Sequence, residues 1–504
     1  MLATISSATV LGVEGRPVTV EVHISKGLPC FTVVGLPDTS CRESRDRVRA
    51  ALLSSGVDWP TTRITVNLAP TTVRKVGSGL DLATAVGLLV AGGDVPEASV
   101  ENTAFFGELG LDGSVRRVAG LVPLVDSVSA DTVVVPAGSA NEARLVGRHK
   151  VRPVATLGEL IAALKQEEPW PDHEDPPVID RRPPGPDLAE VRGQPVARKA
   201  VEVAAAGGHH LLLVGPPGSG KTMLARRLNG LLPPLTIEQA LEVTRIHSAA
   251  GLPLGGGLIC EAPLRAPHHS STMVSLVGGG TATMRPGEIS AAAHGVLFLD
   301  ELGEFKVDVL EALRQPLEEG VIRVCRARAT VRYPARFLLV AATNPCPCGE
   351  GGPPAGGCRC SAVARQRYDR RLSGPLLDRF DLRVDVGRPS VTDLLGAQAA
   401  EPTSEVATRV AAARERAHQR GVIANGQLSG SEVEHCTPLS PGAKRFLEAS
   451  LSNGLLSARG LGRIRRVALT LADLDQCDGP LSADHVALAA QLRVRPALSY
   501  RRSA

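Results

Sequence analysis

A glycine-rich turn with one lysine constrains this chain more than any other feature of its sequence. The turn follows an apolar run at 211–214 and precedes a segment of helical character at 223–229, and this order of strand, turn and helix is what a P-loop requires. The turn and the first residue after it are Gly215, Pro216, Pro217, Gly218, Ser219, Gly220, Lys221, Thr222 and Met223. In such a turn backbone N–H groups converge on phosphate oxygens, the lysine reaches the β- and γ-phosphates, and the threonine hydroxyl ligates Mg²⁺. We therefore expect residues 215–223 to bind a nucleoside triphosphate.

Composition limits the classes of protein to which the chain can belong. A chain of 504 residues allows about two to four domains. The net charge is only +4, so the chain as a whole does not attract nucleic acid and any basic site must be local. Aromatic residues make up 3% of the chain, which argues against a platform for base stacking. The sequence shows no export signal and no apolar run of about 18 residues, so we expect a cytoplasmic protein that is not embedded in a membrane. In that compartment the ten cysteines are expected to be thiols or metal ligands.

A proline-dense, acidic stretch divides the chain into regions. Residues 166–187 have no apolar period and predict an extended, solvated linker. The segment before it, 1–165, mixes strand and helix patterns. Residues 188–388 alternate strands and helices around the P-loop, which predicts a mostly parallel sheet, and residues 389–504 are helical in pattern. The expected fold is α/β: an N-terminal α/β domain, a linker, an α/β P-loop core and a C-terminal helical lid.

Hydrophobic periodicity predicts individual elements inside these regions. Apolar and polar residues alternate at 18–24 and at 63–68, as in half-buried strands. Small apolar residues at 80–89 indicate a helix. In the C-terminal region, 405–420 and 462–474 are the strongest helix candidates.

Two further apolar runs end in polar residues that suit a nucleotide site. The run at 295–299 delivers Asp300 and Glu301, and the run at 337–343 delivers Asn344. Buried parallel strands present such residues at their carboxyl ends, where ligands bind. Behind a P-loop, Asp300 would hold the Mg²⁺ shell, Glu301 would polarise the attacking water, and Asn344 would orient that water or contact the γ-phosphate. The alternatives are a buried strand with an exposed acidic end and an asparagine that only caps its strand.

The three motifs in this order resemble Walker A, Walker B and sensor 1 of the AAA+ ATPases. The segment 373–381 looks like the arginine-finger segment of the magnesium-chelatase and minichromosome-maintenance branch, which maps onto Arg379; a structural pair with a neighbouring aspartate is the alternative. The start of the helix near 460 is similar to sensor 2, which maps onto Arg459. Its competitors are Arg463, Arg465 and Arg466. A finger that acts in trans implies a ring, by family analogy a homo-hexamer.

A basic hairpin precedes the strand that ends at Asn344. Residues 320–333 read as two alternating strands around a short turn and carry Arg323, Arg326 and Arg328. In related AAA+ helicases such a hairpin faces the central channel, where arginines contact phosphates without reading sequence. A solvated hairpin with incidental arginines is the alternative.

Two groups of residues suggest metal ligands. Four cysteines in a CxC-x9-CxC arrangement could close a tetrahedral zinc site, or could be free or redox-active thiols. They are Cys346, Cys348, Cys358 and Cys360. The adjacent His268 and His269 lack an obvious third ligand, and we interpret them as loop or interface residues.

The N-terminal region resembles the protease domain of Lon, a ribosomal S5 domain 2-like fold, at 106–121 and at 74–82. A Lon-type protease uses a Ser–Lys dyad. Aligned on these segments, the nucleophile position falls on Gly79, with Ser78 one residue away, and the lysine position falls on Leu124. We therefore expect a Lon-like fold without proteolysis, which serves interaction or assembly.

Taken over its whole length except the linker, the chain resembles the ComM/YifB family of magnesium-chelatase-like AAA+ ATPases. Supporting segments are 27–37, 45–51, 193–194 and 204–209. The resemblance implies an ATP-driven, hexameric DNA motor with ATP and Mg²⁺ as cofactors, a branch-migration helicase that acts on single-stranded or branched DNA in natural transformation or repair, without sequence preference. One alternative is a chelatase-type motor subunit that remodels a protein partner. Another is an ATP-dependent protease, although the absence of the Ser–Lys dyad argues against it.

Overall fold

The computed structural model describes most of the chain. The described ranges are 1–171, 185–255, 257–280, 284–326, 329–351, 358–372, 374–395, 400–454 and 456–493. Most of the linker expected at 166–187 therefore lies outside the described residues.

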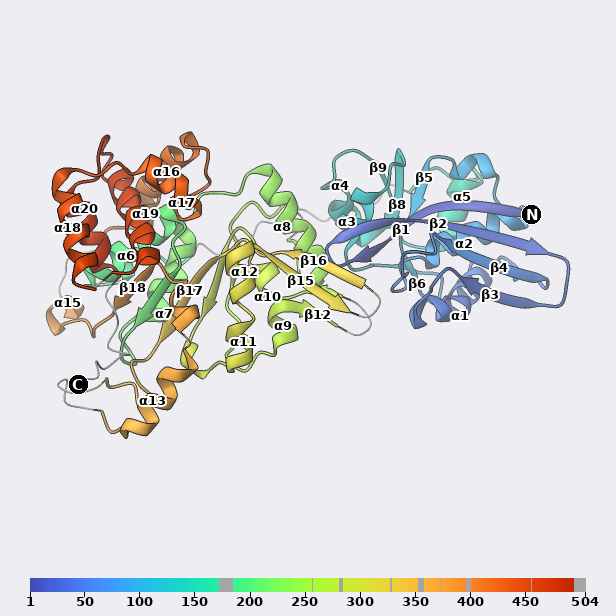
Figure 1. The fold of residues 1–504 in the computed structure, drawn as a ribbon. Helices are drawn as coiled ribbons and strands as arrows, with labels where there is room; N and C mark the ends of the chain where they lie inside the picture. The colour runs from blue at the N-terminus through green and yellow to red at the C-terminus, as the bar shows by residue number, and fades with distance from the viewer. Residues whose placement is uncertain are drawn as a thin grey trace.

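The N-terminal region is built on a seven-stranded mixed sheet (Figure 1). In spatial order its strands are β3 (Cys30–Val34), β4 (Arg63–Ala69), β2 (Glu14–Ser25), β1 (Leu2–Leu11), β5 (Thr103–Phe105), β8 (Thr132–Pro136) and β9 (Lys150–Val154). β1 and β4 run antiparallel to β2, and the other neighbours are parallel. The strands expected at 18–24 and 63–68 lie within β2 and β4, so both expectations are confirmed.

Helices cover both faces of this sheet. The helices are α1 (Thr39–Ser54), α2 (Asp81–Gly92), α3 (Leu121–Ser127), α4 (Ala140–Arg144) and α5 (Leu157–Leu164), with 3-10 turns η1 (Glu97–Val100) and η2 (Ala137–Ser139). In β1, Ala3 and Ile5 enter the core beneath α1, α2 and α5, whereas Ala8 enters the core beneath α3 and α4. The alternation follows from the two-residue period of a strand. The expected small-residue helix at 80–89 corresponds to α2, which is buried over most of its length.

The P-loop region contains a second sheet, with five parallel strands. Their order is β11 (Leu264–Arg265), β14 (Val296–Leu299), β17 (Leu338–Thr343), β10 (Leu211–Val214) and β18 (Leu382–Asp385). In β10, Leu211 and Leu213 enter one core, and Leu212 and Val214 enter another on the opposite face. Strands buried on both faces read as continuous apolar runs, which is why the sequence marks them clearly.

Helices, 3-10 turns and two small ribbons surround the five-stranded sheet. The helices are α6 (Pro195–Gly207), α7 (Lys221–Leu228), α8 (Ile237–Ala250), α9 (Met273–Val277), α10 (Glu288–Ala291), α11 (Val307–Glu311), α12 (Arg314–Glu319), α13 (Ala362–Arg371), α14 (Gly374–Leu377) and α15 (Val391–Leu395). The 3-10 turns are η3 (Leu188–Glu190), η4 (Asn229–Leu231) and η5 (Leu302–Glu304), and the ribbons are β12 (Gly278–Gly279) with β13 (Arg285–Pro286) and β15 (Val321–Arg326) with β16 (Ala329–Pro334). A further ribbon, β6 (Glu108–Leu109) with β7 (Val115–Arg116), belongs to the N-terminal region.

The C-terminal region is helical and shares a core with the P-loop sheet. Its elements are α16 (Thr403–Gln419), η6 (Asn425–Gln427), α17 (Gly430–Cys436), α18 (Pro441–Ser452), α19 (Ala458–Leu474) and α20 (Ala483–Gln491). The expected helices at 405–420 and 462–474 correspond to α16 and α19. One apolar cluster joins Leu213 and Val340 of the sheet to Val467 and Leu471 of α19, so this region packs directly on the P-loop core.

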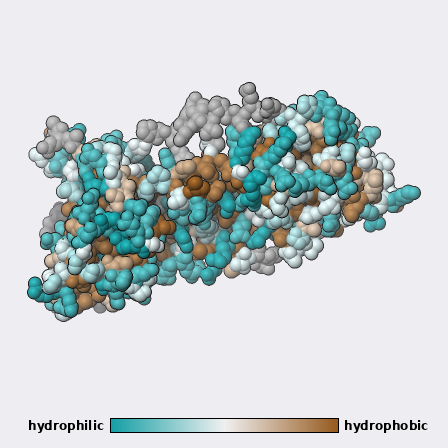
Figure 2. Space-filling model, turned by 90° about the horizontal axis from the view of Figure 1, so that it is seen from above, coloured by the Kyte–Doolittle hydropathy of each residue, from teal (hydrophilic) through white to brown (hydrophobic). Residues whose placement is uncertain are grey.

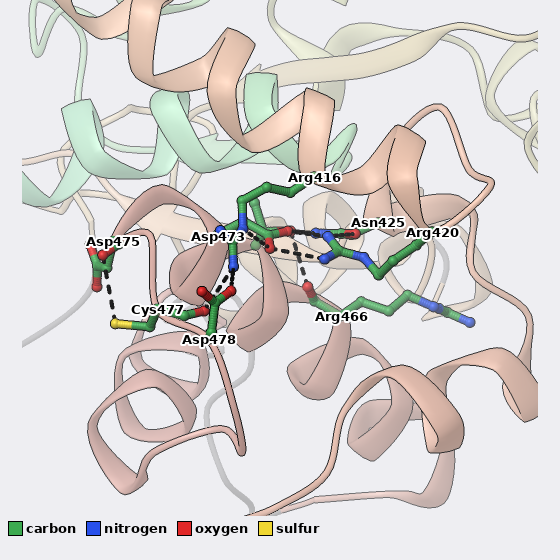
Figure 3. A network of polar contacts seen from close by, with 9 residues as sticks. Arg416, Arg420, Asn425, Arg466, Asp473, Asp475, Cys477 and Asp478 are labelled. Atoms are coloured by element: carbon green, nitrogen blue, oxygen red, sulfur yellow. Dashed lines mark hydrogen bonds and ion pairs between the residues drawn. The ribbon is translucent and has the colours of Figure 1, made fainter.

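A polar network inside the helical region holds α16 against α19. Asp473 on α19 is 2% exposed. Arg416 of α16 and Arg420, the residue that follows α16, turn toward it (Figure 3). Asn425 Nδ2 donates to the same carboxylate at 2.7 Å. Because a buried charge is tolerated only when it is paired, Asp473 fixes the angle between the two helices.

The N-terminal region packs against the P-loop region through helices α3 and α8. Ser248 of α8 accepts a hydrogen bond from the backbone N–H of Gly120 at 3.0 Å, and its hydroxyl donates to Glu142 at 2.7 Å. Arg245, also on α8, lies 2.6 Å from Asp126. The ribbon β15–β16 also extends from the P-loop region toward the N-terminal region (Figure 1).

The fold class expected from the sequence is confirmed: parallel α/β sheets with a C-terminal helical region. Among the described residues, no helix combines the length and apolar character that crossing a membrane requires. On the face shown in Figure 2, hydrophilic residues cover most of both ends, and the largest apolar patch lies near the middle.

Candidate nucleotide site

The glycine-rich turn lies between β10 and α7, as the sequence predicts. Gly218 and Gly220 have φ angles of 75° and 88°, in the region that favours glycine. A side chain at Gly215 would place its Cβ 2.1 Å from the backbone oxygen of Val386. The turn can therefore pass this closely over the sheet only with glycine at that position.

Lys221 points back under this turn. Its ammonium donates to the backbone oxygens of Gly215 at 2.7 Å and Pro216 at 2.9 Å, and to Asn344 Oδ1 at 3.3 Å. Burial lowers the pKa of Lys221, and the charge of Asp300 opposes that shift. A half-desolvated cation whose partners are neutral oxygens is suited to an incoming anion.

The turn also holds a buried hydroxyl without a partner. Ser219 is 1% exposed, and its Oγ makes no hydrogen bond with the described residues. A buried polar atom without a partner carries a free-energy cost, and a phosphate oxygen would supply the missing partner. Together with the cation and the convergent backbone, this observation fits a triphosphate.

Thr222 and Asp300 meet at the same end of the sheet. Thr222 Oγ1 donates to Asp300 Oδ2 at 2.8 Å, and Asp300 Oδ1 accepts from the backbone N–H of Glu301 at 2.9 Å. The hydroxyl and the carboxylate are hard oxygen ligands of the kind that Mg²⁺ takes alongside phosphate oxygens. These residues therefore fit a Mg²⁺ that accompanies the triphosphate. Met223, the next residue, is 43% exposed.

Glu301 has an unexpected partner. Its backbone is left-handed, with φ at 52°, which is uncommon for a residue other than glycine and recurs at functional sites. Its carboxylate lies 3.0 Å from His269 Nδ1 and is more than half exposed. Sequence reasoning treated His269 as a loop or interface residue. No sequence motif links His269 to Glu301. The contact depends on the path of the chain between β11 and β14, which the sequence pattern does not predict.

Gln194 was not identified as a site residue from the sequence. Its φ of 59° is left-handed, and its side-chain amide donates to the backbone oxygens of Ser219 at 2.6 Å and Gly387 at 2.8 Å. Gln194 thus ties the P-loop to the segment after β18. The only available signal was its place in a Gly-Gln pair just before helix α6.

Arg379 and Arg459 lie in a separate group of cations. Arg379 forms an ion pair with Glu318 of α12. Burial, followed by the charges of Arg463, Arg459 and others, lowers the pKa of Arg379. Among the described residues, the contacts of Arg379 include none with the P-loop. The structure therefore brings Lys221, Thr222, Asp300 and Asn344 together, whereas the partners of Arg379 lie elsewhere.

Asp381 connects that arginine group to the core. Its carboxylate lies 3.5 Å from both His209 Nδ1 and Arg463 Nε. Burial works against its ionisation, but hydrogen bonding and charge from His209, with the charge of Arg463, outweigh it and lower the pKa of Asp381 to about 2. His209 also contacts Thr470 of α19 at 2.8 Å. Asp381 is therefore charged at neutral pH and holds the start of α19 over the core.

The basic segment forms the expected hairpin of β15 and β16. Arg323 and Arg332 stand directly opposite each other in its register, on the exposed face. Arg326 ends β15, and Arg328 lies outside the described residues. Arg323 also pairs with Glu319 at 3.3 Å. Like charges directly opposite one another destabilise a sheet, so a further anionic partner would stabilise this face.

The four cysteines of the CxC-x9-CxC arrangement converge. Their sulfur atoms all lie within 4.8 Å of one another, and none is in a disulfide. In the N-terminal region, by contrast, Ser78 donates to Glu108, and the buried Lys75 donates to the backbone oxygen of Pro70. The two residues nearest to a Lon-type dyad thus each have another partner.

Family models for subunit ChlI of magnesium chelatase match three consecutive parts of the chain. "Subunit ChlI of Mg-chelatase" matches residues 20–139, "Magnesium chelatase, subunit ChlI" matches 187–394, and the ChlI C-terminal model matches 400–493. The chain is 41% identical over 497 residues to the YifB protein of Salmonella typhimurium, with 98% of this chain and 97% of that protein covered. It is 40% identical over 508 residues to competence protein ComM of Haemophilus influenzae, with 99% of each covered.

The chain belongs to the ComM/YifB family.

This family is magnesium-chelatase-like, and the chain is accordingly an AAA+ protein of the ComM type. A protein of Mycobacterium tuberculosis, described as uncharacterized, is 48% identical over 496 residues, with 97% of each chain covered. The match to these ComM/YifB relatives spans the N-terminal sheet, the P-loop core and the helical region alike. The three regions of the chain therefore occur together in its relatives.

Proposed function

We propose that the chain is the subunit of an ATP-driven, hexameric DNA motor, a branch-migration helicase that acts on recombination intermediates in natural transformation or DNA repair. Its division would be an N-terminal Lon-like domain at 1–165, a linker at 166–187, an AAA+ core at 188–388 and a helical lid at 389–504. Support comes from the full-length similarity to a protein named for competence and from the geometry of the nucleotide site.

In this proposal the P-loop holds the triphosphate and the residues around it divide the remaining tasks. Lys221 exchanges its backbone oxygen partners for phosphate oxygens. Thr222 and Asp300 would hold Mg²⁺, which would supply positive charge to offset that of the phosphates. Glu301 accepts a proton from the attacking water, and Asn344, already hydrogen-bonded to Lys221, orients that water. The position of these side chains at the carboxyl ends of β10, β14 and β17 supports the assignment.

Arg379 would act as an arginine finger on the nucleotide of the neighbouring subunit, and Arg459 would serve as the sensor 2 arginine. Both lie in one group of cations, and the lowered pKa of Arg379 reflects burial and the charges of the other arginines. In this proposal a γ-phosphate replaces or joins Glu318, the acid with which Arg379 pairs inside its own chain. Such an arrangement requires a closed assembly of identical subunits.

The observation that carries the DNA assignment is the hairpin. Arg323 and Arg332 are paired across the strands on the exposed face, while the opposite face, with Val324 and Val331, is buried in the core. This face supplies positive charge without aromatic side chains, which suits contact with phosphates without base readout. In the sequence, Arg326 and Arg328 belong to the same basic segment. We also assign a structural Zn²⁺ to the four cysteines.

The test is ATP-dependent branch migration of a synthetic four-way DNA junction by the full-length chain and by Lys221→Ala. Migration by the wild type alone supports the motor. The variant Arg326→Ala/Arg328→Ala should lose junction processing and keep its basal ATPase activity, and unchanged processing would remove the hairpin from the mechanism. If the wild type hydrolyses ATP but moves no junction, fork or displaced strand, the DNA assignment is wrong, and a chelatase-type motor acting on a protein becomes the better account.

A further inference from the structure

The four cysteine sulfurs lie close enough together to bind a single tetrahedral ion. Cys346 Sγ lies 3.3 Å from Cys348 Sγ and 3.7 Å from Cys358 Sγ, and the last two are 3.7 Å apart. With Zn–S bonds of about 2.3 Å, a tetrahedral site requires sulfurs about 3.8 Å apart. Cys360 completes the set within the same 4.8 Å limit. Four thiolates that close all positions around an ion are typical of structural rather than catalytic zinc.

The cluster is attached directly to the nucleotide site. Cys346 follows Asn344 by two residues and is 1% exposed. Its backbone oxygen accepts from Gly349 N–H at 2.9 Å, which closes the first turn of the cluster. This turn packs on the P-loop: a Cβ on Gly349 would lie 2.6 Å from Pro217 Cδ. The segment that holds the first two cysteines therefore touches both the P-loop and the residue that hydrogen-bonds Lys221.

The same segment is tied to the P-loop by a second route. Glu350 pairs with Arg388 at 3.1 Å. The residue before Arg388, Gly387, accepts a hydrogen bond from Gln194, whose amide also donates to Ser219 O of the P-loop. A displacement of the cysteine turn would thus act on the P-loop through Pro217 and through Gln194.

We propose that the four cysteines form a zinc clip that positions Asn344 and the P-loop, so that metal occupancy sets the rate of ATP turnover. The clip acts through other residues and is not itself catalytic. This inference rests on the proposed ATPase function. Loss of the metal releases Cys346 and Cys348 from the second cysteine pair, and the turn that supports Asn344 loses its anchor. A misplacement of about 1 Å in such a site costs on the order of a hundredfold in rate.

The first measurement is the zinc content of the purified full-length chain, prepared with a thiol reductant and without chelator. The wild type and Lys221→Ala should each contain about one zinc per chain, and Cys348→Ser should lose its zinc to a chelator that leaves the wild type loaded, because only three thiolates then hold the ion. Cys260→Ser is the matched control, since Cys260 is an exposed cysteine outside the cluster. Zinc-free wild type, or iron in place of zinc, overturns the clip.

The second measurement is ATP turnover together with the affinity for a fluorescent ATP analogue. Cys348→Ser should turn over ATP at least about tenfold more slowly than wild type, whereas Cys260→Ser should match wild type. Because a cysteine variant can fail to fold, zinc is also removed from the wild type with a thiol-reactive mercurial and a chelator, followed by reductant and zinc. Turnover that falls and returns with zinc supports the clip. Turnover that survives complete removal of zinc overturns it.

These results are independent of the DNA assignment. Lys221→Ala hydrolyses no ATP, yet its zinc content still reports on the clip. A wild type that contains zinc and hydrolyses ATP without moving DNA contradicts the motor and leaves the clip intact.

Discussion

Gly12, at the turn between β1 and β2, lies directly against Val331 of β16. A Cβ at Gly12 would be 2.2 Å from Val331 Cγ1 and 3.3 Å from Tyr333 Cε1. The neighbouring Leu11 and Val13 pack on the same apolar cluster. The tip of the N-terminal sheet therefore contacts the buried face of the hairpin, and the arginines lie on the opposite face.

The first prediction concerns this contact. Gly12→Ala should destabilise the chain by about 1–3 kcal/mol, because the added methyl overlaps Val331 and Gly12 has a left-handed φ of 71°. Thermal unfolding checks the loss. Gly147→Ala is the matched control, since Gly147 has a φ of 77° but nothing within 4 Å of its added Cβ. Equal losses in both variants would mean that backbone strain, and not the contact with Val331, accounts for the effect.

The second prediction concerns the buried carboxylate in Figure 3. Asp473→Ala leaves Arg416, Arg420 and Asn425 without their shared acceptor, and breaking such a buried pair typically costs about 3–5 kcal/mol. Chemical denaturation should show this loss. Asp478→Ala is the control: Asp478 also pairs with Arg416 but is 87% exposed, so its removal should cost less than about 1 kcal/mol. A small effect at Asp473 would contradict its role in holding α16 to α19.

The third prediction is a pH dependence centred on His210. Burial lowers the pKa of His210 from 6.5 to about 4, with opposing effects from Asp381 on one side and His209 and Arg463 on the other. The backbone N–H of Leu339 donates to its Nδ1 at 3.0 Å, so the ring must be neutral there. Between pH 4 and 6.5 the unfolded chain binds more protons at this residue, so the stability it contributes is complete above pH 6.5 and falls as the pH drops toward 4.

The loss amounts to about 1–3 kcal/mol for a shift of this size in a largely buried group. Denaturation midpoints at pH 7 and pH 4.5 measure it. His210→Asn, whose side-chain oxygen can accept from Leu339 without titrating, should reduce the difference between the two pH values. The exposed His435→Asn serves as control. An unchanged pH difference in His210→Asn would assign the effect to other groups.

The sequence was most informative where function depends on local geometry. The P-loop needs consecutive residues with defined backbone angles, so it can be read from 215–222 alone. The buried strands that carry Asp300 and Asn344 were visible because both faces are apolar. The cysteine spacing likewise predicted a cluster, and the four sulfurs do converge.

Contacts between distant segments could not be predicted in this way. Gln194 contacts the P-loop, and His269 contacts Glu301, only because the strand order brings their loops together at the carboxyl ends of the strands. Likewise, nothing near Gly12 in the sequence indicates that it packs on Val331. These contacts depend on tertiary packing, which single-residue patterns do not encode.

The fourth prediction tests the partner of Glu301. His269 Nδ1 lies 3.0 Å from the Glu301 carboxylate, so the carboxylate must give up this contact before it can accept a proton from the attacking water. His269→Ala should therefore raise basal ATP turnover, by up to about fivefold, which corresponds to the roughly 1 kcal/mol of a typical hydrogen bond. His268→Ala is the matched control, because His268 bonds Ser270 instead. Steady-state ATPase assays without DNA decide the point, and reduced turnover in His269→Ala alone would show that His269 assists Glu301.

The fifth prediction concerns the exposed face of the hairpin. Arg323 and Arg332 face each other across β15 and β16. The salt dependence of DNA binding is measured as the slope of log affinity against log salt concentration. Each arginine that neutralises a phosphate steepens this slope by about 0.7–0.9. The double variant Arg323→Ala/Arg332→Ala should therefore bind single-stranded and branched DNA more weakly and with a slope shallower by about 1–2. Arg323→Lys/Arg332→Lys, which keeps both charges, should retain most of the slope. Removal of Arg16, an exposed arginine of the N-terminal sheet paired with Glu14, controls for a general loss of positive charge. If the alanine pair and Arg16→Ala have equal effects, the hairpin is not the DNA contact, and the opposed arginines must serve another anion.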